Sequence, residues 1–165
     1  MSHNMLVISD TSPISNLIVI GKLSLLKKVF DVIVIPESVY SEIKALEKFN
    51  VDLTEFRNAS WIKIVQIHDL NTYHELLKQV DKGEAEAITI AHEMKSDFLL
   101  IDEKKGRAIA KEMGIKIIGL IGVLVKAKRE KSIDNVKPIL DDLRNVARFR
   151  ISEDLYNEIL KSVNE

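Results

Sequence analysis

Short apolar runs alternate with longer stretches of helical periodicity along the chain, and this alternation restricts the possible folds more than any other feature. The runs predict strands over Met5–Ser9, Val32–Ile35, Trp61–Ile67, Phe98–Ile101 and Lys116–Gly119. Strands separated by helices pair in parallel through right-handed crossovers, and the helices then cover both faces of the sheet. The pattern therefore predicts an α/β fold, a three-layer sandwich with a five-stranded parallel sheet.

The length of the chain favours one domain. Its 165 residues, 46% of them hydrophobic, can fill one core well and are few for two. We expect a main unit over residues 1–150 and a C-terminal helix over residues 151–165 that packs on it or extends it. Two amphipathic helices are predicted after Ile133. Their apolar positions suit either packing within the chain or a partner surface, and they are Leu140, Leu143, Leu155 and Ile159.

Composition excludes several classes of function. The 24 basic and 25 acidic residues nearly cancel, so there is no overall charge signature of nucleic-acid or membrane binding, although a local basic patch remains compatible with these counts. The absence of cysteine excludes disulfides, thiolate metal sites and thiol catalysis. No apolar run approaches the roughly 20 residues of a membrane span. We therefore expect a cytoplasmic protein.

An aspartate follows the first predicted strand. Ser12 and Pro13 have the usual order of a helix N-cap and a first helical residue, so Asp10 lies two residues too early to cap that helix. It stands instead at the carboxyl end of Met5–Ser9. In open α/β sheets, that edge is where ligands bind.

A second aspartate has the same position relative to its strand. Phe98–Ile101 runs directly into Asp102, and Glu103 follows. We expect Asp10 and Asp102 to lie at the carboxyl ends of adjacent parallel strands. A helix cap is the alternative role for Asp102.

Two glutamates in predicted helices complete the candidate set. In DKGEAEAITIAHEM, a rotation of about 100° per residue places Glu84 on the apolar face and Glu86 about 200° away, facing outward. Alternatively, Glu84 closes a capping box with Asp81. In SVYSEIKAL, Glu42 lies about 60° from the centre of the buried stripe, where a solvated flank is the alternative.

Four carboxylates in one crevice require a compensating charge. Two unpaired carboxylates about 4 Å apart repel by roughly 4 kcal/mol at an effective dielectric near 20, so either some are protonated or a cation lies between them. Oxygen ligands without cysteine or paired histidines suit Mg²⁺ or Mn²⁺. We predict a site for such an ion built from Asp10, Glu42, Glu84 and Asp102, with Glu103 as a fifth ligand.

Basic residues follow the second aspartate. Lys104, Lys105, Arg107 and Lys111 lie on the helix after Asp102. A second basic cluster comprises Lys126, Lys128, Arg129 and Lys131. Such runs commonly form a solvated face, but those beside Asp102 are candidates for contacts with phosphates.

Five motifs in order carry a resemblance to a known family. VISDTSPISNL, IPESVYSEI, DKGEAEAI, LLIDEKKGRAIAKEMGI and IGLIGVLVKAKREKSI resemble the PIN domain family (PilT N-terminus), in its branch close to VapC-type toxins. The similarity extends from about Met5 to Arg150. It implies a PIN-like nuclease domain over residues 1–150, with a five-stranded parallel sheet and a metal-dependent site that cleaves single-stranded RNA. For the toxin branch it also implies an antitoxin partner and a homodimer.

The resemblance also implies roles for individual residues. Asp10, Glu42, Glu84 and Asp102 match the acidic quartet of the family by position, and the hydroxyls of Thr11 and Ser12 lie next to it. The chain departs from the pattern at two of these positions. Many relatives have aspartate in place of Glu84 and a polar residue in place of Asp102.

Two other classes of protein also fit parts of the sequence. A haloacid-dehalogenase-like phosphatase starts from an aspartate at a strand end, but it needs a second aspartate two residues later, where this chain has Ser12. A nucleic-acid-binding module without catalysis could keep the same fold. A metal-titrated RNA cleavage assay separates these classes from a nuclease.

Overall fold

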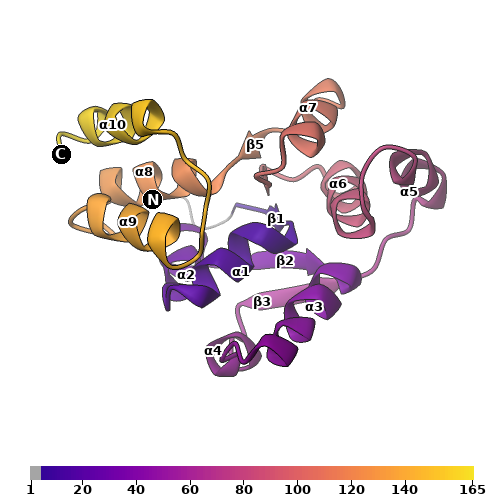
Figure 1. Cartoon of the computed structure of the whole chain (residues 1–165). Coiled ribbons are helices and arrows are strands. Elements are labelled where there is room, and N and C mark those ends of the chain that lie inside the picture. Colours follow the sequence, from indigo (N-terminus) through magenta and orange to yellow (C-terminus); the bar gives the residue numbers. More distant parts are fainter. Residues whose placement is uncertain (1–4) are drawn as a thin grey trace.

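The computed structural model describes residues 5–165, and a five-stranded, all-parallel sheet forms its centre (Figure 1). The strand order is β3-β2-β1-β4-β5. The strands are β1 (Val7–Ser9), β2 (Ile33–Pro36), β3 (Ile62–Val65), β4 (Phe98–Leu100) and β5 (Ile117–Ile118). All five predicted strands and their parallel pairing are therefore confirmed, and each paired segment is shorter than the apolar run that predicted it, except β2, which keeps its length one residue later.

Helices fill every connection. They are α1 (Thr11–Val19), α2 (Ser24–Phe30), α3 (Glu37–Lys44), α4 (Thr54–Arg57), α5 (Leu70–Leu77), α6 (Lys82–Met94), α7 (Lys104–Glu112), α8 (Leu120–Arg129), α9 (Lys137–Asn145) and α10 (Glu153–Ser162), with a 3₁₀ helix, η1 (Ala45–Phe49), after α3. Figure 1 shows α8, α9 and α10 on one side of the molecule and α5, α6 and α7 on the other. The sheet is thus covered on both faces, as predicted for a three-layer sandwich.

Alternation along the strands divides the core in two. Val7 packs into the larger cluster and its neighbour Ile8 into the smaller one, and Leu100 and Leu99 divide in the same way. Because successive side chains of a strand point to opposite faces, a strand that is buried on both faces reads as a continuous apolar run. This burial explains why β1, β2 and β4 could be recognised in the sequence.

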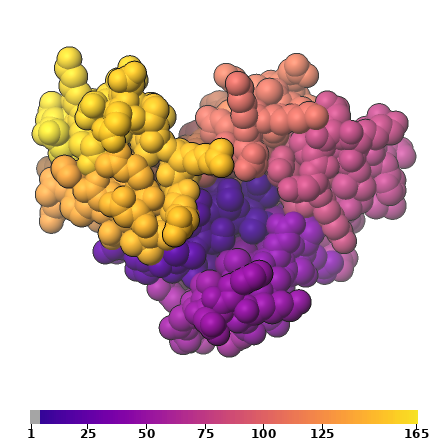
Figure 2. Space-filling view, viewed as in Figure 1, coloured from indigo at the N-terminus to yellow at the C-terminus, as the bar shows by residue number. Residues whose placement is uncertain are grey.

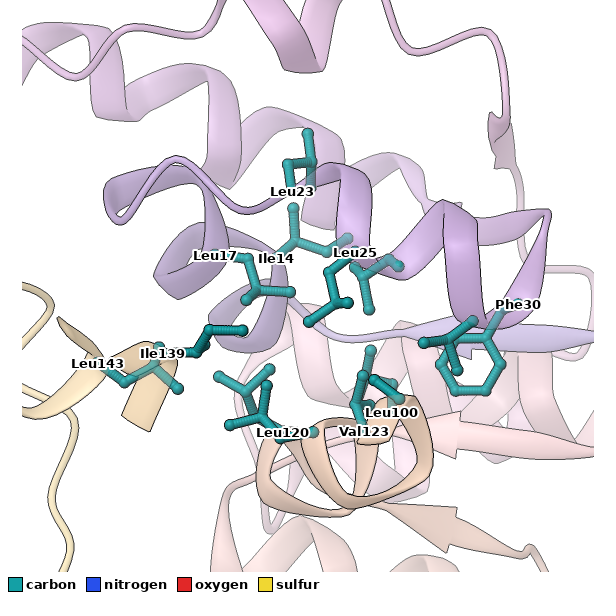
Figure 3. Close-up of a cluster of buried hydrophobic side chains, with 14 of the residues drawn as sticks. Ile14, Leu17, Leu23, Leu25, Phe30, Leu100, Leu120, Val123, Ile139 and Leu143 are labelled. Atoms are coloured by element: carbon teal, nitrogen blue, oxygen red, sulfur yellow. The ribbon is translucent and has the colours of Figure 1, made fainter. Parts of the chain in front are cut away.

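The larger cluster joins α1 and α2 to the C-terminal helices. Figure 3 shows Leu17 of α1 facing Leu120 of α8 and Ile139 of α9. Leu140, Leu143 and Ile159 are also buried in this cluster, whereas Leu155 is 41% exposed. Three of the four apolar positions that suited either packing or a partner surface are therefore used within the chain.

Charged and polar features mark the periphery of the sheet. β3 forms one edge and carries Lys63, whose side chain is exposed, and a lysine at an edge opposes pairing with another chain.

Within residues 5–165, every helix is too short or too polar to cross a membrane.

Candidate active site

Asp10 lies where β1 ends and α1 begins. Its backbone N–H donates to the carbonyl oxygen of Leu100 at 2.9 Å, which extends the pairing of β1 with β4 by one residue. Its side chain is 4% exposed and makes no capping hydrogen bond to α1. The structure thus confirms that Asp10 and Asp102 follow adjacent parallel strands, and it buries the first of the two carboxylates.

The prediction that Ser12 caps α1 is wrong. The helix begins at Thr11, and Asp10 occupies the N-cap position. Pro13 is then the third helical residue, where its missing N–H still costs nothing because the N–H groups of the first turn have no partner inside the helix.

Burial and three neighbouring acids act on the carboxyl of Asp10. Burial raises its pKa from the ordinary 3.8 to about 7, against a hydrogen bond from the backbone of Thr11 that lowers it, and the charges of Asp81, Glu42 and Glu103 raise it further. Within residues 5–165, Asp10 is therefore a buried carboxyl group surrounded by like charges and without an ion pair.

Glu42 reaches the same place from α3. Its carboxylate accepts a hydrogen bond from the hydroxyl of Thr11 and lies over Gly83 in the first turn of α6. A Cβ at position 83 would come within 2.9 Å of both carboxylate oxygens, so a larger residue there would displace the carboxylate. Thr11 and Gly83 thus both favour this position of Glu42.

Glu84 enters the site from the first turn of α6. Asp81 caps this helix, because its Oδ1 accepts the backbone N–H of Glu84 at 2.9 Å. The side chain of Glu84 lies instead against α7, where a Cβ at Gly106 would come within 2.9 Å of its Oε2. Burial raises the pKa of Glu84 from 4.5 to about 8, and the charges of Asp81 and Asp10 add to this effect.

The prediction that Glu86 faces outward is wrong. Its side chain is 8% exposed, and its Oε1 accepts the backbone N–H of Ser38 at 3.2 Å. Ser38 lies in the first turn of α3, so Glu86 satisfies one of the N–H groups that a helix leaves unpaired at its start. One glutamate of α6 thus enters the acidic site, and the other holds the helix that carries Glu42.

Asp102 turns toward β5. Its Oδ1 accepts the backbone N–H of Leu120, the first residue of α8, at 3.0 Å, and its Oδ2 is buried without a hydrogen-bond partner among the described residues. Burial raises the pKa of Asp102, while Arg107 opposes this shift. Asp102 therefore contacts a helix start, but that of α8 and not that of the helix that follows it.

Glu103 acts electrostatically on the buried acids of the site. It is exposed at the N-cap position of α7 without a capping hydrogen bond. Its charge raises the pKa of both Asp10 and Glu84. Glu103 is thus electrostatically coupled to the buried pair.

We call Asp10, Glu42, Asp81, Glu84 and Glu103 the acidic cluster. Asp81 was not predicted as part of it, although the D-x-x-E spacing places Asp81 one helical turn before Glu84. Among residues 5–165, no three acidic or histidine side chains are already close enough to hold one metal ion. The cluster is an assembly of mutually repelling oxygens and not a closed cage.

The basic residues divide into engaged and exposed ones. Arg107 donates from Nη1 to the carbonyl oxygen of Ile101 at 2.7 Å, whereas Lys104, Lys105 and Lys111 are exposed. In the second cluster, Lys126 pairs with Glu130 and Lys128 with Glu165. Lys104 and Lys105, which directly follow Glu103 in the chain, are thus exposed cations next to the acidic cluster.

The raised pKa values predict that the metal-free protein loses stability as the pH rises. In the unfolded chain, Asp10 and Glu84 release their protons near their ordinary pKa values of 3.8 and 4.5, whereas in the folded chain they release them near 7 and 8. Between these limits the folded state binds more protons, so the free energy of unfolding falls with rising pH. Urea unfolding in EDTA at about pH 5.5 and about pH 8.5 measures the difference.

Two controls assign this loss to the acidic cluster. The double variant Asp10→Asn/Glu84→Gln should keep most of its stability at the higher pH. Adding Mn²⁺ at that pH should stabilise the wild type more than the double variant, because a ligand that binds only the folded state stabilises it. A wild type equally stable at both pH values in EDTA would contradict the burial of these two carboxyls.

Comparison with known proteins identifies the family of the chain. No curated protein matches the chain. The sequence model of one family, described as a PIN domain, matches residues 6–165. This match extends beyond Arg150, where the resemblance was expected to end, and includes α10. With its five-stranded parallel sheet and acids at the carboxyl edge, the chain therefore belongs to the PIN domain family, whose fold is of the nuclease type.

Proposed function

We propose that this protein is a metal-dependent endoribonuclease that hydrolyses phosphodiester bonds of single-stranded RNA. One observation supports this most directly: Asp10 and Glu84 are buried carboxyls, and the largest charge effects on both come from other acids. Maintaining two such groups near neutral pH is costly for a fold. A bound cation would offset this repulsion, and the carboxylates would serve as its ligands.

The donor set fits Mg²⁺ or Mn²⁺. All candidate ligands are carboxylate oxygens, and Gly83 and Gly106 leave space in which the carboxylates of Glu42 and Glu84 lie against the backbone. Asp10, Glu42 and Glu84 would hold the ion. When bound, such an ion lowers the pKa of a water molecule and offsets the charge that builds on the phosphate.

For a fourth ligand we favour Glu103 over Asp102. Glu103 acts on both buried carboxyls, whereas Asp102 already accepts the N–H of Leu120. Asp102 has an Oδ2 atom without a partner among the described residues, so it is our second candidate for the fourth ligand. Thr11 would orient Glu42 through its hydroxyl, and Ser12 lines a hollow beside Glu103 where a substrate phosphate would pass.

The resemblance to VapC-type toxins extends the proposal to a toxin held by an antitoxin and to a homodimer. Of the apolar positions considered for a partner surface, only Leu155 is exposed. A dimer would therefore use another face or the outer side of α10. Light scattering of the purified protein measures its oligomeric state.

A metal titration tests the proposed reaction. The protein is stripped with EDTA and incubated with a labelled, unstructured RNA, linear or circular, while Mg²⁺ or Mn²⁺ is added. We expect no cleavage in EDTA and internal cleavage with either ion, with the circular RNA cut as well. RNA that is bound but never cut with any ion would favour the module without catalysis.

A further inference from the structure

A loop far from the acids in sequence lies beside them in space. The residues Ala147–Arg150 connect α9 to α10, and we call them the 147–150 loop. Together with Ser12, Asn16, Asp102 and Glu103 they line a hollow of about 310 Å³. Figure 2 shows the orange-yellow part of the chain projecting toward the salmon part near α7, with the indigo N-terminal part recessed between them.

A second hollow continues the first. It has a volume of about 520 Å³ and extends along β5 and the start of α8. Asp102, Phe149 and Arg150 line both hollows, and Arg107 lines the second. Because they share these three residues, the two hollows adjoin at the 147–150 loop, and we call them together the groove; Glu103 of the acidic cluster lines the first of them.

The groove carries cations whose side chains face solvent. Arg148 and Arg150 are exposed, and neither forms an ion pair or a side-chain hydrogen bond within residues 5–165. Arg144, on the preceding helix, is by contrast paired with Glu153 at 2.8 Å. Two unpaired arginines that flank a set of uncompensated acids suit a ligand with negative charge on its backbone.

Phe149 adds an aromatic surface between the two arginines. Its backbone N–H donates to Leu143 at 2.8 Å, and its half-buried ring packs on the larger core cluster while also lining both hollows. An aromatic ring held on the core, with a cation on either side of it in the sequence, has the composition of sites that stack bases and contact phosphates of single strands.

We infer that the 147–150 loop is the RNA-binding element of this protein, with Arg148 and Arg150 contacting backbone phosphates and Phe149 stacking on a base. This inference rests on the proposed function. Because Asp10 and Glu84 are only 4% and 9% exposed, a phosphate reaches them by entering a recess. A flexible single strand can do so, and a rigid duplex cannot.

Binding in EDTA tests the arginines without cleavage. The probe is a fluorescein-labelled oligo(U) RNA, and fluorescence anisotropy is measured over a range of salt concentrations. Each phosphate contact with a single strand contributes about 0.7 to the salt slope. The double variant Arg148→Gln/Arg150→Gln should therefore reduce the slope by about 1.4, and its affinity at 0.1 M salt should fall about 25-fold.

Matched variants make the result specific. Lys27→Gln/Lys28→Gln removes two exposed positive charges from α2. The end of α2 leads into the amino end of β2, whereas the acids lie at the carboxyl ends of the strands. This variant should leave affinity and slope unchanged. Phe149→Leu keeps an apolar side chain on the core and should weaken binding about fivefold or more without changing the slope. A duplex of equal length should compete poorly. Circular dichroism checks that each variant is folded.

The outcomes separate the two proposals. If the wild type cleaves RNA and the arginine variant binds with the same affinity and slope as the lysine variant, the inference about the loop is overturned alone. If Phe149→Leu binds like the wild type, or the duplex competes equally, base stacking on a single strand is overturned. If the loop variants lose binding as expected and no ion supports cleavage, the proposed nuclease activity fails and the RNA-binding loop remains.

Discussion

Replacing Asp10 by asparagine is expected to reduce metal-dependent RNA cleavage by about 100-fold or more, equal to about 2.7 kcal/mol of transition-state stabilisation. The reason is the position of this carboxylate, which lies at the carboxyl end of a central strand, is 4% exposed and is affected by the charges of three other acids. An amide of the same shape cannot supply the charge that a divalent ion requires. The measurement is the initial cleavage rate at saturating Mn²⁺.

The same substitution should leave the fold intact. At about pH 8 the wild type must bury an ionised carboxyl, whereas asparagine is neutral, so the metal-free variant should unfold at a temperature no lower than that of the wild type. Asp134→Asn, which alters an exposed acid, should change neither quantity. A variant of Asp10 that cleaves RNA at the wild-type rate would remove this residue from the site.

Replacing Glu84 by glutamine is expected to cut cleavage at least about tenfold, equal to about 1.4 kcal/mol. A purely capping role predicts no loss, because Asp81 caps α6 through the backbone N–H of Glu84, which the substitution leaves in place. The result therefore distinguishes a ligand from a residue that only starts a helix. Rates are compared over Mg²⁺ and Mn²⁺ titrations at matched folded fractions.

The choice of control matters for this comparison. Glu86 shares the helix and the local sequence of Glu84, but it is buried and bound to Ser38, so its substitution would disturb α3 and Glu42. Glu112 is exposed at the end of α7, and Glu112→Gln removes the same charge without a buried contact. Equal activity of the Glu84 and Glu112 variants would leave the site to Asp10, Glu42 and Glu103.

The strands β1, β2 and β4 were predictable because they are largely buried and so read as continuous apolar runs. Their pairing and the place of Asp10 followed from general rules for parallel sheets. The start of α1 was not predictable to the residue, because proline fits any position of a first helical turn. Ser12 and Asp10 were thus both compatible with the local rules.

The error at Glu86 has a different origin. A helical projection assumes one buried face, yet every residue from Gly83 to Ala91 is buried in α6. A helix enclosed on all sides has no outward face on which to place a charge. The alternation of glutamate and alanine in GEAEA therefore could not show that both acids point into the protein.

Long-range geometry determined the remaining differences. Whether Asp102 or Glu103 joins the other acids depends on the direction of the turn after β4, which two adjacent acids do not encode. Arg148 and Arg150 lie in an irregular segment more than 130 residues after Asp10 in the sequence. Only the path of α9 across the larger core brings them to the acidic edge.

The bond between Glu86 and Ser38 has a consequence for protein engineering. Helix α6 carries Glu84 directly, and through Glu86 it also contacts the start of α3, which carries Glu42. The positions of both ligand candidates therefore depend on α6. Grafting the carboxylates alone onto another parallel sheet would transfer the chemical groups without the part that sets their spacing. A working graft would have to carry α6 whole, with Gly83 under Glu42 and Glu86 beneath the start of α3.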